Sequence, residues 1–400
     1  MAKLYPRVYE AIFARHLARN RQMLFVPGPR QVGKTTTCRG LGDAYLNIDN
    51  MDERKAIMAG PASLAARVAR AGKGKPRPVV VLDELHKWKK WKAFLKGFFD
   101  TYEARVRVIV TGSSRLDVYR RGGDSMMGRY FPYRMHPFSV GEIARQEVPR
   151  VSVRPPVRVP EAEFRALWEH GGYPEPFVKR QAAFTRQWHH VRRSQLLRED
   201  LRDFTNVQEL SQIGAVASLL EARSAASLVY SNLAESVNAS VDTIRRWVQT
   251  LVALHHGFLL RPWHRKIARS LLKEPRWYLR DWSGIRDPGA RAETFVACHL
   301  LKAVEGWTDL GMGEFALHYL RDKQHHEVDF LVVRDGSPWF LVEVKRSDDN
   351  LNPSLPYFQG KTGARHAFQV AIDAPFADAD CFSREDPVKV SARTFLSQLL

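Results

Sequence analysis

Residues 28–35, with the sequence GPRQVGKT, constrain the fold of this chain more than any other segment. The apolar run MLFV precedes them, and TTTCRGL, which can begin a helix, continues from them. Two glycines at this spacing, followed by lysine and threonine, are typical of a phosphate-binding loop between a strand and a helix. The sequence therefore predicts a nucleotide-binding domain with a largely parallel α/β sheet.

The residue types in this loop each suit one part of a nucleotide. The glycines let backbone N–H groups curve around phosphate oxygens, the Lys34 ammonium reaches the β and γ phosphates, and the Thr35 hydroxyl is a ligand for Mg²⁺. The residues expected to bind the nucleotide are Gly28, Pro29, Arg30, Gln31, Val32, Gly33, Lys34, Thr35 and Thr36.

A second apolar strand, VVVLDEL at residues 79–85, contains two carboxylates at its end. Such a pair alone is often only a turn, but its position downstream of the loop matches the metal side of the same site. We expect Asp83 to hold Mg²⁺ through water and Glu84 to polarise the attacking water as general base. The later strand RVIVTGSS places Ser113 or Ser114 as a γ-phosphate sensor, although TGSS is also common at helix N-termini.

Short apolar runs alternate with helical stretches over the first 145 residues, which is typical of an α/β fold. The strand candidates are residues 23–26, 44–49, 79–83 and 106–111. We assign residues 1–146 to a P-loop domain. A Pro- and Val-rich linker at residues 147–160 follows it.

The composition is strongly basic, with 62 Lys and Arg against 43 Asp and Glu in 400 residues, a formal charge of +19. This charge attracts polyanions such as nucleic acid, although a solvated basic surface has the same composition. The three cysteines lack a CxxC spacing, and no run of 18 apolar residues occurs. We expect a cytoplasmic protein without disulfides or membrane spans.

Two modules are predicted in the middle of the chain. Residues 161–223 have a mainly helical pattern, interrupted by the turn GGYPEP, and form a lid or connector. Residues 224–265 have the pattern of a winged helix-turn-helix, with Ser240 as the cap of its second helix and Trp247 in its core. The residues expected at its exposed face, in contact with DNA or a docked protein, are Thr243, Arg245 and Arg246.

Residues 266–400 are predicted to be mixed α/β. EVDFLVV, a turn at Asp335-Gly336, and WFLVEVK form a β-hairpin. Glu343 and Lys345 share one face of their strand. A two-residue turn would pair Asp329 with Val342 and separate it from Glu343, whereas a bulge would bring the two carboxylates together.

Pro338 is the place where we expect such a bulge, because proline cannot donate to the ladder. With the helical Glu293, the set Glu293, Asp329, Glu343 and Lys345 resembles the Asp and Glu-x-Lys constellation of the restriction-endonuclease-like fold. That resemblance implies a carboxylate site for Mg²⁺, with the lysine orienting a water against a phosphodiester. The fold can also persist without catalysis.

Most of the chain resembles the AAA-family ATPases of bacteria and archaea in which a P-loop core is joined to a C-terminal half of unknown function. The resemblance rests on GPRQVGKTT, VVVLDEL, TGSS, GRYFPYRMHPFSVGEI, GGYPEP, EVDF and VEVK. It implies ATP and Mg²⁺ as cofactors. It also makes Arg129, in GRY, a candidate for completing the γ-phosphate site of its own subunit or a neighbour, unless Arg129 pairs with a carboxylate to fix its loop.

Three functions remain open from the sequence. The preferred one is ATP hydrolysis that drives a switch or motor acting on DNA or a DNA-associated partner. The second is an ATP-dependent nuclease that requires Mg²⁺ and uses the C-terminal carboxylates. The third is a slow ATPase that regulates another protein by docking on it, and a homo-oligomer is compatible with each function.

Overall fold

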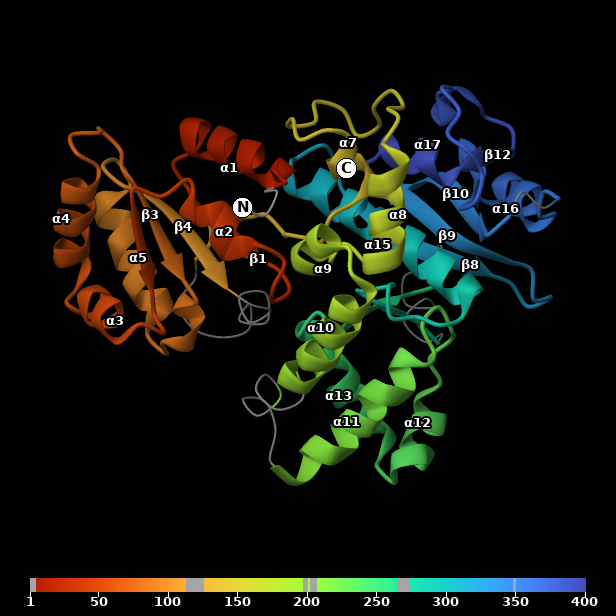
Figure 1. Cartoon of the computed structure of the whole chain (residues 1–400), viewed down its shortest axis with the longest axis horizontal. Coiled ribbons are helices and arrows are strands. Elements are labelled where there is room, and N and C mark those ends of the chain that lie inside the picture. The colour runs from red at the N-terminus through yellow and green to blue at the C-terminus, as the bar shows by residue number, and fades with distance from the viewer. Residues whose placement is uncertain (1–4, 113–125, 197–200, 202–206, 265–273, 348–349) are drawn as a thin grey trace. The chain divides into compact units, whose positions relative to one another are not determined.

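The computed structural model describes residues 5–112, 126–196, 201, 207–264, 274–347 and 350–400 (Figure 1). The chain divides into two compact units. Unit 1 comprises Met1–Pro137 and Gln146–Val148, and unit 2 comprises Phe138–Arg145 and Pro149–Leu400. Within the described ranges, no helix combines the length and the apolar character needed to cross a membrane.

Unit 1 is built on a five-stranded sheet with the order β2-β3-β4-β1-β5, in which every neighbouring pair is parallel. The carboxyl ends of all strands therefore lie at one edge, and the predicted parallel α/β core is confirmed. The strands are β1 (Met23–Pro27), β2 (Ala44–Asn47), β3 (Val79–Asp83), β4 (Arg107–Gly112) and β5 (Tyr130–Pro132).

Helices cover this sheet, which explains the continuous apolar runs of its strands. One face packs in a core with residues of α3, α4 and α5, while α1 and α2 contact β1, β3 and β4. Strand residues that lie outside that core, such as Val26 and Ile109, are also fully buried. The helices are α1 (Val8–Arg19), α2 (Lys34–Arg39), α3 (Met51–Met58), α4 (Pro61–Ala71), the 3₁₀ turn η1 (Leu85–Lys87) and α5 (Trp91–Tyr102).

The first half of unit 2 is helical. Residues 145–160 contain neither helix nor strand, and GGYPEP turns only at its start, because α9 already begins at Pro174. After α13 comes a small antiparallel pair of strands, β6 (Gly257–Leu260) and β7 (Arg276–Leu279). The helices are α7 (Val140–Ala144), α8 (Glu161–His170), α9 (Pro174–Lys179), α10 (Ala182–Gln195), α11 (Val207–Glu221), α12 (Tyr230–Val237) and α13 (Val241–Ala253).

The second half of unit 2 contains a mixed sheet with the order β12-β11-β10-β9-β8. Strands β8, β9 and β10 pair antiparallel, and β11 and β12 then add in parallel. The predicted mixed α/β architecture is therefore confirmed. Its elements are α15 (Pro288–Asp309), β8 (Phe315–Arg321), β9 (Glu327–Arg334), β10 (Ser337–Lys345), α16 (Ser354–Thr362), β11 (His366–Ala371), β12 (Val388–Ser391) and α17 (Ala392–Ser397).

The β9–β10 hairpin contains the bulge that the nuclease-like arrangement requires. Asp335 and Gly336 form a two-residue turn with positive φ angles of 49° and 78°, as in primed hairpin turns. The register then shifts between Pro338 and Phe340, so Val342 pairs with Phe330 rather than with Asp329. Because side chains alternate along a strand, this one extra residue places Asp329 and Glu343 on the same face.

Candidate nucleotide site and C-terminal ion cluster

The predicted phosphate loop connects the carboxyl end of β1 with α2, and glycine is required at two of its positions. Gly33 caps α2 with φ 99° and ψ 15°, a left-handed conformation that side chains disfavour. At Gly28 the backbone passes so close to Met135 that an added Cβ would lie 2.4 Å from its carbonyl oxygen. The loop therefore has the tight curvature that the motif predicts.

Lys34 lies inside the curve of this loop. Its buried ammonium donates hydrogen bonds to the carbonyl oxygens of Gly28 and Pro29 at 2.8 and 2.7 Å. Burial lowers the pKa of Lys34 to about 8, an effect that the carboxylates of Glu84 and Asp83 partly oppose. The ammonium is thus held next to the backbone that would surround the phosphates.

Asp83 brings the loop and three strands together. Its carboxylate accepts hydrogen bonds from the hydroxyls of Thr35 at 2.8 Å and Tyr45 at 2.6 Å, and from the hydroxyl of Thr111. The two residues predicted to hold Mg²⁺, Thr35 and Asp83, are therefore adjacent, and their hydroxyl and carboxylate oxygens are the hard donors that this ion prefers. The predicted sensor residues Ser113 and Ser114 lie outside the described residues. Thr111 of the same TGSS segment is described, and it is the residue whose hydroxyl donates to Asp83.

Glu84 stands directly after β3 with a positive φ of 56°. Burial is the main cause that raises the pKa of Glu84, against the opposing effect of Lys34. Its carboxylate lies 3.6 Å from His86 Nε2 and 3.7 Å from Lys87 Nζ. A raised pKa makes the carboxylate a stronger base, which suits the role predicted for it.

Arg129 lies at the amino-terminal edge of the sheet, opposite the edge that carries the phosphate loop. Its carbonyl oxygen accepts a hydrogen bond from the backbone of Met23, the first residue of β1, while the phosphate loop follows the last residue of β1. Its guanidinium makes a bidentate pair with Asp100, at 2.8 and 3.0 Å. The pair with a carboxylate that the sequence offered as the alternative is therefore present, and a γ-phosphate role for Arg129, in its own subunit or a neighbour's, stays a prediction.

Arg7 is a contact of the phosphate loop that the sequence did not indicate. This buried guanidinium donates to the carbonyl oxygens of Val32 and His136, both at 2.6 Å. The backbone of His136 in turn donates to the Tyr9 hydroxyl at 2.9 Å. The start of α1 therefore clamps the loop to the segment at Met135 and His136, the segment that also crowds Gly28.

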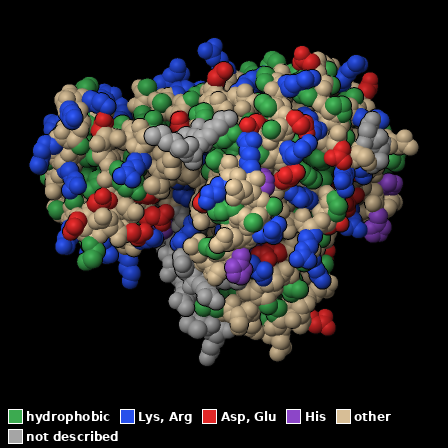
Figure 2. Space-filling model, viewed as in Figure 1, with side chains coloured by type: hydrophobic (Ala, Val, Ile, Leu, Met, Phe, Trp, Pro, Cys, Tyr) green, Lys and Arg blue, Asp and Glu red, His purple; other side chains and the backbone are tan. Residues whose placement is uncertain are grey.

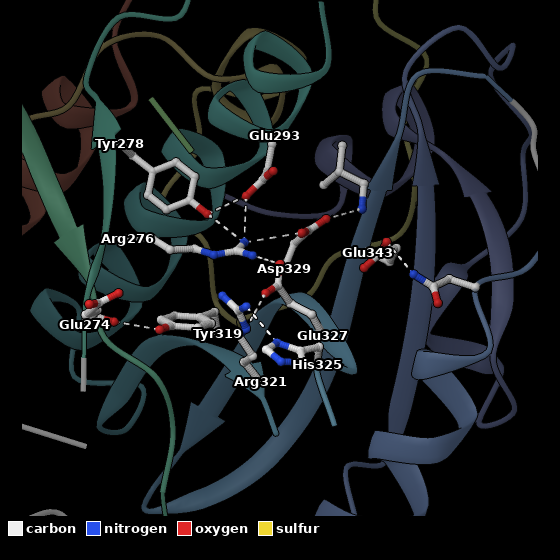
Figure 3. A network of polar contacts seen from close by, with 12 residues as sticks. Glu274, Arg276, Tyr278, Glu293, Tyr319, Arg321, His325, Glu327, Asp329 and Glu343 are labelled. Carbon is white, nitrogen blue, oxygen red and sulfur yellow. Dashed lines mark hydrogen bonds and ion pairs between the residues drawn. The ribbon is translucent and has the colours of Figure 1, made fainter. Parts of the chain in front are cut away.

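The predicted nuclease-like carboxylates come together in unit 2, but around an arginine (Figure 3). Arg276 on β7 donates to Glu293 at 3.0 Å and lies 3.5 Å from Asp329, and its guanidinium also pairs with Glu327. The Tyr278 hydroxyl donates to Glu293 at 2.6 Å. Arg276 is 5% exposed, so these charges interact in a largely dehydrated environment.

The charges in this ion cluster, comprising Arg276, Glu293, Glu327 and Asp329, strongly affect one another. Burial and the neighbouring carboxylates raise the pKa of Asp329 well above its usual range, and burial is also the main cause that raises the pKa of Glu293. The other two predicted residues are paired separately, because Lys345 and Asn352 donate to Glu343 at 2.9 and 2.6 Å.

The cation at the centre of the cluster is the Arg276 guanidinium. In the described part of the chain, no group of three or more His, Cys, Asp and Glu side chains is arranged so that it could hold a metal ion. Arg276 was not predicted because its strand, RWYL, carries no motif. Only its position in the fold relates it to Glu293 and Asp329.

The predicted DNA-contacting residues lie at the start of α13, where Ser240 caps the helix as expected by accepting a hydrogen bond from Thr243. Arg245 and Arg246 are exposed and Trp247 is buried. Arg246 pairs with Glu209 at 3.2 Å, and the guanidinium of Arg245 lies 5.3 Å from the centre of the Tyr230 ring. Arg245 is therefore engaged within the module, and Arg246 is paired with α11 of the preceding helical segment.

Residues 20–144 match the family model described as an AAA domain. Together with the parallel sheet, the phosphate loop and Asp83, this match defines unit 1 as an AAA-type P-loop domain. Residues 161–286 and 288–371 match two models described as domains of unknown function, DUF8612 and DUF4143.

Two relatives are uncharacterized proteins of Mycobacterium bovis and Mycobacterium tuberculosis, each 21% identical over 336 residues, which cover 81% of this chain and 70% of the relative. Among solved structures, the Aeropyrum pernix ORC1 protein in complex with DNA matches with a TM-score of 0.31 and 12% identity over 74% of this chain and 93% of its own. PCH-2 of C. elegans matches with a TM-score of 0.24 and 12% identity, over 60% of this chain and 66% of its own. Likenesses at these TM-scores carry no conclusion about this chain.

The clamp at Arg7 generates a first prediction. In Arg7→Lys, one compact ammonium replaces a planar fork that spans two carbonyl oxygens, and an unsatisfied buried carbonyl costs about 1–3 kcal/mol. We expect the affinity for a fluorescent ATP analogue to fall about tenfold or more, equivalent to about 1.4 kcal/mol. Arg15→Lys, on the exposed side of the same helix, is the control, and equal affinity of the two variants would contradict the role of the clamp.

A second prediction concerns Arg276. Arg276→Met leaves buried carboxylates without their counter-charge and should lower the free energy of unfolding by about 3–5 kcal/mol at neutral pH. The pKa of Asp329 is raised in the folded state, so this carboxylate takes up a proton as the pH falls and the unpaired buried charge of the variant is reduced. The difference in free energy of unfolding between the variant and the wild type should therefore shrink toward pH 5. Urea unfolding at several pH values measures both effects. Arg321→Met, which removes an exposed partner of Glu327, should cost about 1 kcal/mol or less.

Proposed function

We propose that the chain is an ATPase that binds ATP with Mg²⁺ at residues 28–36 and uses hydrolysis to drive a conformational switch or motor that acts on DNA or on a DNA-associated partner. The observation that carries the ATPase proposal is the contact between Thr35 and Asp83. It joins the end of the phosphate loop to the end of β3, at 2.8 Å, and leaves Lys34 and Glu84 beside it.

The residues of the site divide the work of hydrolysis among them. Lys34 neutralises charge on the outer phosphates, and backbone N–H groups of the loop fix their position. Thr35 and Asp83 would hold Mg²⁺, which when bound stabilises the negative charge of the phosphates. Glu84 accepts a hydrogen bond from the attacking water and draws its proton, a role that its raised pKa favours.

DNA as the target is supported by the basic composition and by the helix pair α12 and α13. It is weakened at the predicted recognition helix, where Arg246 is paired with Glu209 and Arg245 contacts Tyr230. The same contacts favour a module that docks on a protein, the third function left open above. The two possible targets predict different effects of duplex DNA on the rate of ATP hydrolysis.

The nuclease alternative is favoured by the bulge that places Asp329 and Glu343 on one face. The residues as arranged do not fit a bound Mg²⁺, because the Arg276 guanidinium already pairs with Glu293 and Asp329. We therefore derive no cleavage step from this cluster. Cleavage of DNA that persists in Asp329→Ala would place any nuclease activity elsewhere.

The lowered pKa of Lys34 predicts how nucleotide binding depends on pH. Above pH 8 the free ammonium has largely lost its proton, and bound phosphates restore it, so binding should take up a proton. We expect the affinity for ATP to fall by up to about tenfold per pH unit above pH 8. Titration calorimetry in buffers of different ionisation enthalpy measures this uptake. Lys34→Arg, whose guanidinium keeps its charge, should bind with little pH dependence.

The ATPase itself is tested by phosphate release from the purified chain. Lys34→Ala should abolish nucleotide binding, and Glu84→Gln should still bind ATP but hydrolyse it about 10²–10⁴-fold more slowly. Lys89→Ala, which changes an exposed lysine nearby, should resemble the wild type. Unchanged phosphate release in both site variants would refute the proposal.

The same assay with duplex DNA added separates the two targets. Stimulation of the wild type by DNA is expected if the switch acts on DNA. Stimulation should be absent from Glu84→Gln. A rate that does not change with DNA favours the protein-docking regulator.

A further inference from the structure

The positive charge of the chain is concentrated in its N-terminal part. Residues 1–137 hold 27 Lys and Arg against 11 Asp and Glu, whereas residues 138–400 hold 35 against 32. The helix pair predicted to bind DNA adds nothing to this excess, because residues 230–253 hold two arginines against two acidic residues. A polyanion is therefore attracted mainly to the AAA-type domain of unit 1.

Within unit 1, one edge of the sheet carries a continuous run of cationic side chains. Residues 61–78, which form α4 and the loop before β3, contain five cations and no acidic residue. The loop before β4 lies beside them, since the backbone of Arg107 donates to the carbonyl oxygen of Pro78 at 2.9 Å. We call the exposed cations of these two loops and of α4 the basic edge: Arg67, Arg70, Lys73, Lys75, Arg77 and Arg105.

The charge of the basic edge is largely unbalanced. Lys75 pairs with Asp43 at 2.6 Å. Among the described residues, no carboxylate forms an ion pair with any of the other five cations. Burial, and then repulsion by the nearby charge of Arg77, lower the pKa of Arg107. A bound polyanion would relieve this repulsion.

The surface between these cations suits a phosphate backbone. The other exposed residues of α4 have small side chains, so a strand can approach the helix closely: Ala62, Ser63, Ala66, Ala69 and Ala71. None of the large exposed hydrophobic residues of the described chain falls within residues 61–78, whereas a helix that binds a membrane surface needs apolar side chains to insert. Figure 2 shows blue side chains along the left margin of the molecule, where α4 lies in Figure 1.

We propose that the basic edge binds the phosphate backbone of double-stranded nucleic acid without reading its sequence. Guanidinium groups pair with phosphate oxygens in two parallel hydrogen bonds, which favours the arginines of this edge as the contacts. The edge stands at the amino ends of β3 and β4, and the phosphate loop at the carboxyl end of β1. At about 3.3 Å per residue, the strands separate nucleic acid from nucleotide by roughly 15–20 Å.

This inference rests on the proposed action on DNA and is independent of the ATPase activity. Binding of a fluorescent 30-base-pair duplex to the full chain is measured as a function of salt, with vesicles of anionic lipid as a second probe. The test variant is R67Q/R70Q/K73Q/R77Q. The matched control, R165Q/R186Q/R223Q/R384Q, removes the same charge from exposed positions of unit 2. A third variant, R245Q/R246Q, changes the predicted recognition helix.

The test variant should bind the duplex at least about tenfold more weakly at 0.1 M salt. The magnitude of its slope of log K against log salt should fall by about 3–4, because each lost phosphate contact reduces that magnitude by about 0.9. The control should keep the slope of the wild type within about 1. Thermal unfolding of the variants verifies that these exposed substitutions leave the fold intact.

Three results would overturn the inference in distinguishable ways. A wild type that does not bind the duplex even at low salt refutes the basic edge together with action on DNA. Loss of binding in R245Q/R246Q with normal binding in the test variant refutes the basic edge alone. Tighter binding to anionic vesicles than to the duplex, lost in the test variant, identifies lipid as the polyanion instead.

Discussion

The carboxylate of Asp83 is the interaction on which the nucleotide site depends. A charge buried this deeply is tolerated only when hydrogen bonds satisfy it, and here they come from Thr35, Tyr45 and Thr111. These donors belong to the loop, β2 and β4, so one anion fixes the distances between the loop and three parallel strands. The position of Glu84 follows, because it is the next residue of the chain.

The two units stabilise buried carboxylates in different ways. At Asp83 the hydrogen-bonding partners are neutral hydroxyls rather than a paired cation. At Glu293 and Asp329 the paired cation is part of the protein, since Arg276 supplies it permanently. The first arrangement suits a site that binds and releases a charged ligand. The second suits a rigid junction between β7, α15 and β9.

Local patterns in the sequence predicted much of this structure, and long-range partners explain what they missed. Strands β1 to β4 of unit 1 and the hairpin turn follow from short apolar runs and from Asp335-Gly336, whereas β5 was not predicted. Arg7, Thr111 and Arg276 were missed because each acts on residues distant in the sequence, and no spacing rule joins them. The pair of Arg129 with Asp100 shows the same limit, because Asp100 on α5 is distant in the sequence and no motif names it.

The bulge at Trp339 makes chain length, rather than residue identity, the determinant of the C-terminal ion cluster. Deletion of that one residue would keep every carboxylate and a plausible hairpin, yet it would turn all side chains of β10 beyond it to the opposite face. A substitution at Glu343 removes a single group, whereas the deletion would exchange the two sets of side chains that β10 buries on opposite faces of its sheet beyond the bulge. In related chains, a gap of one residue at this position should therefore accompany changes throughout β10.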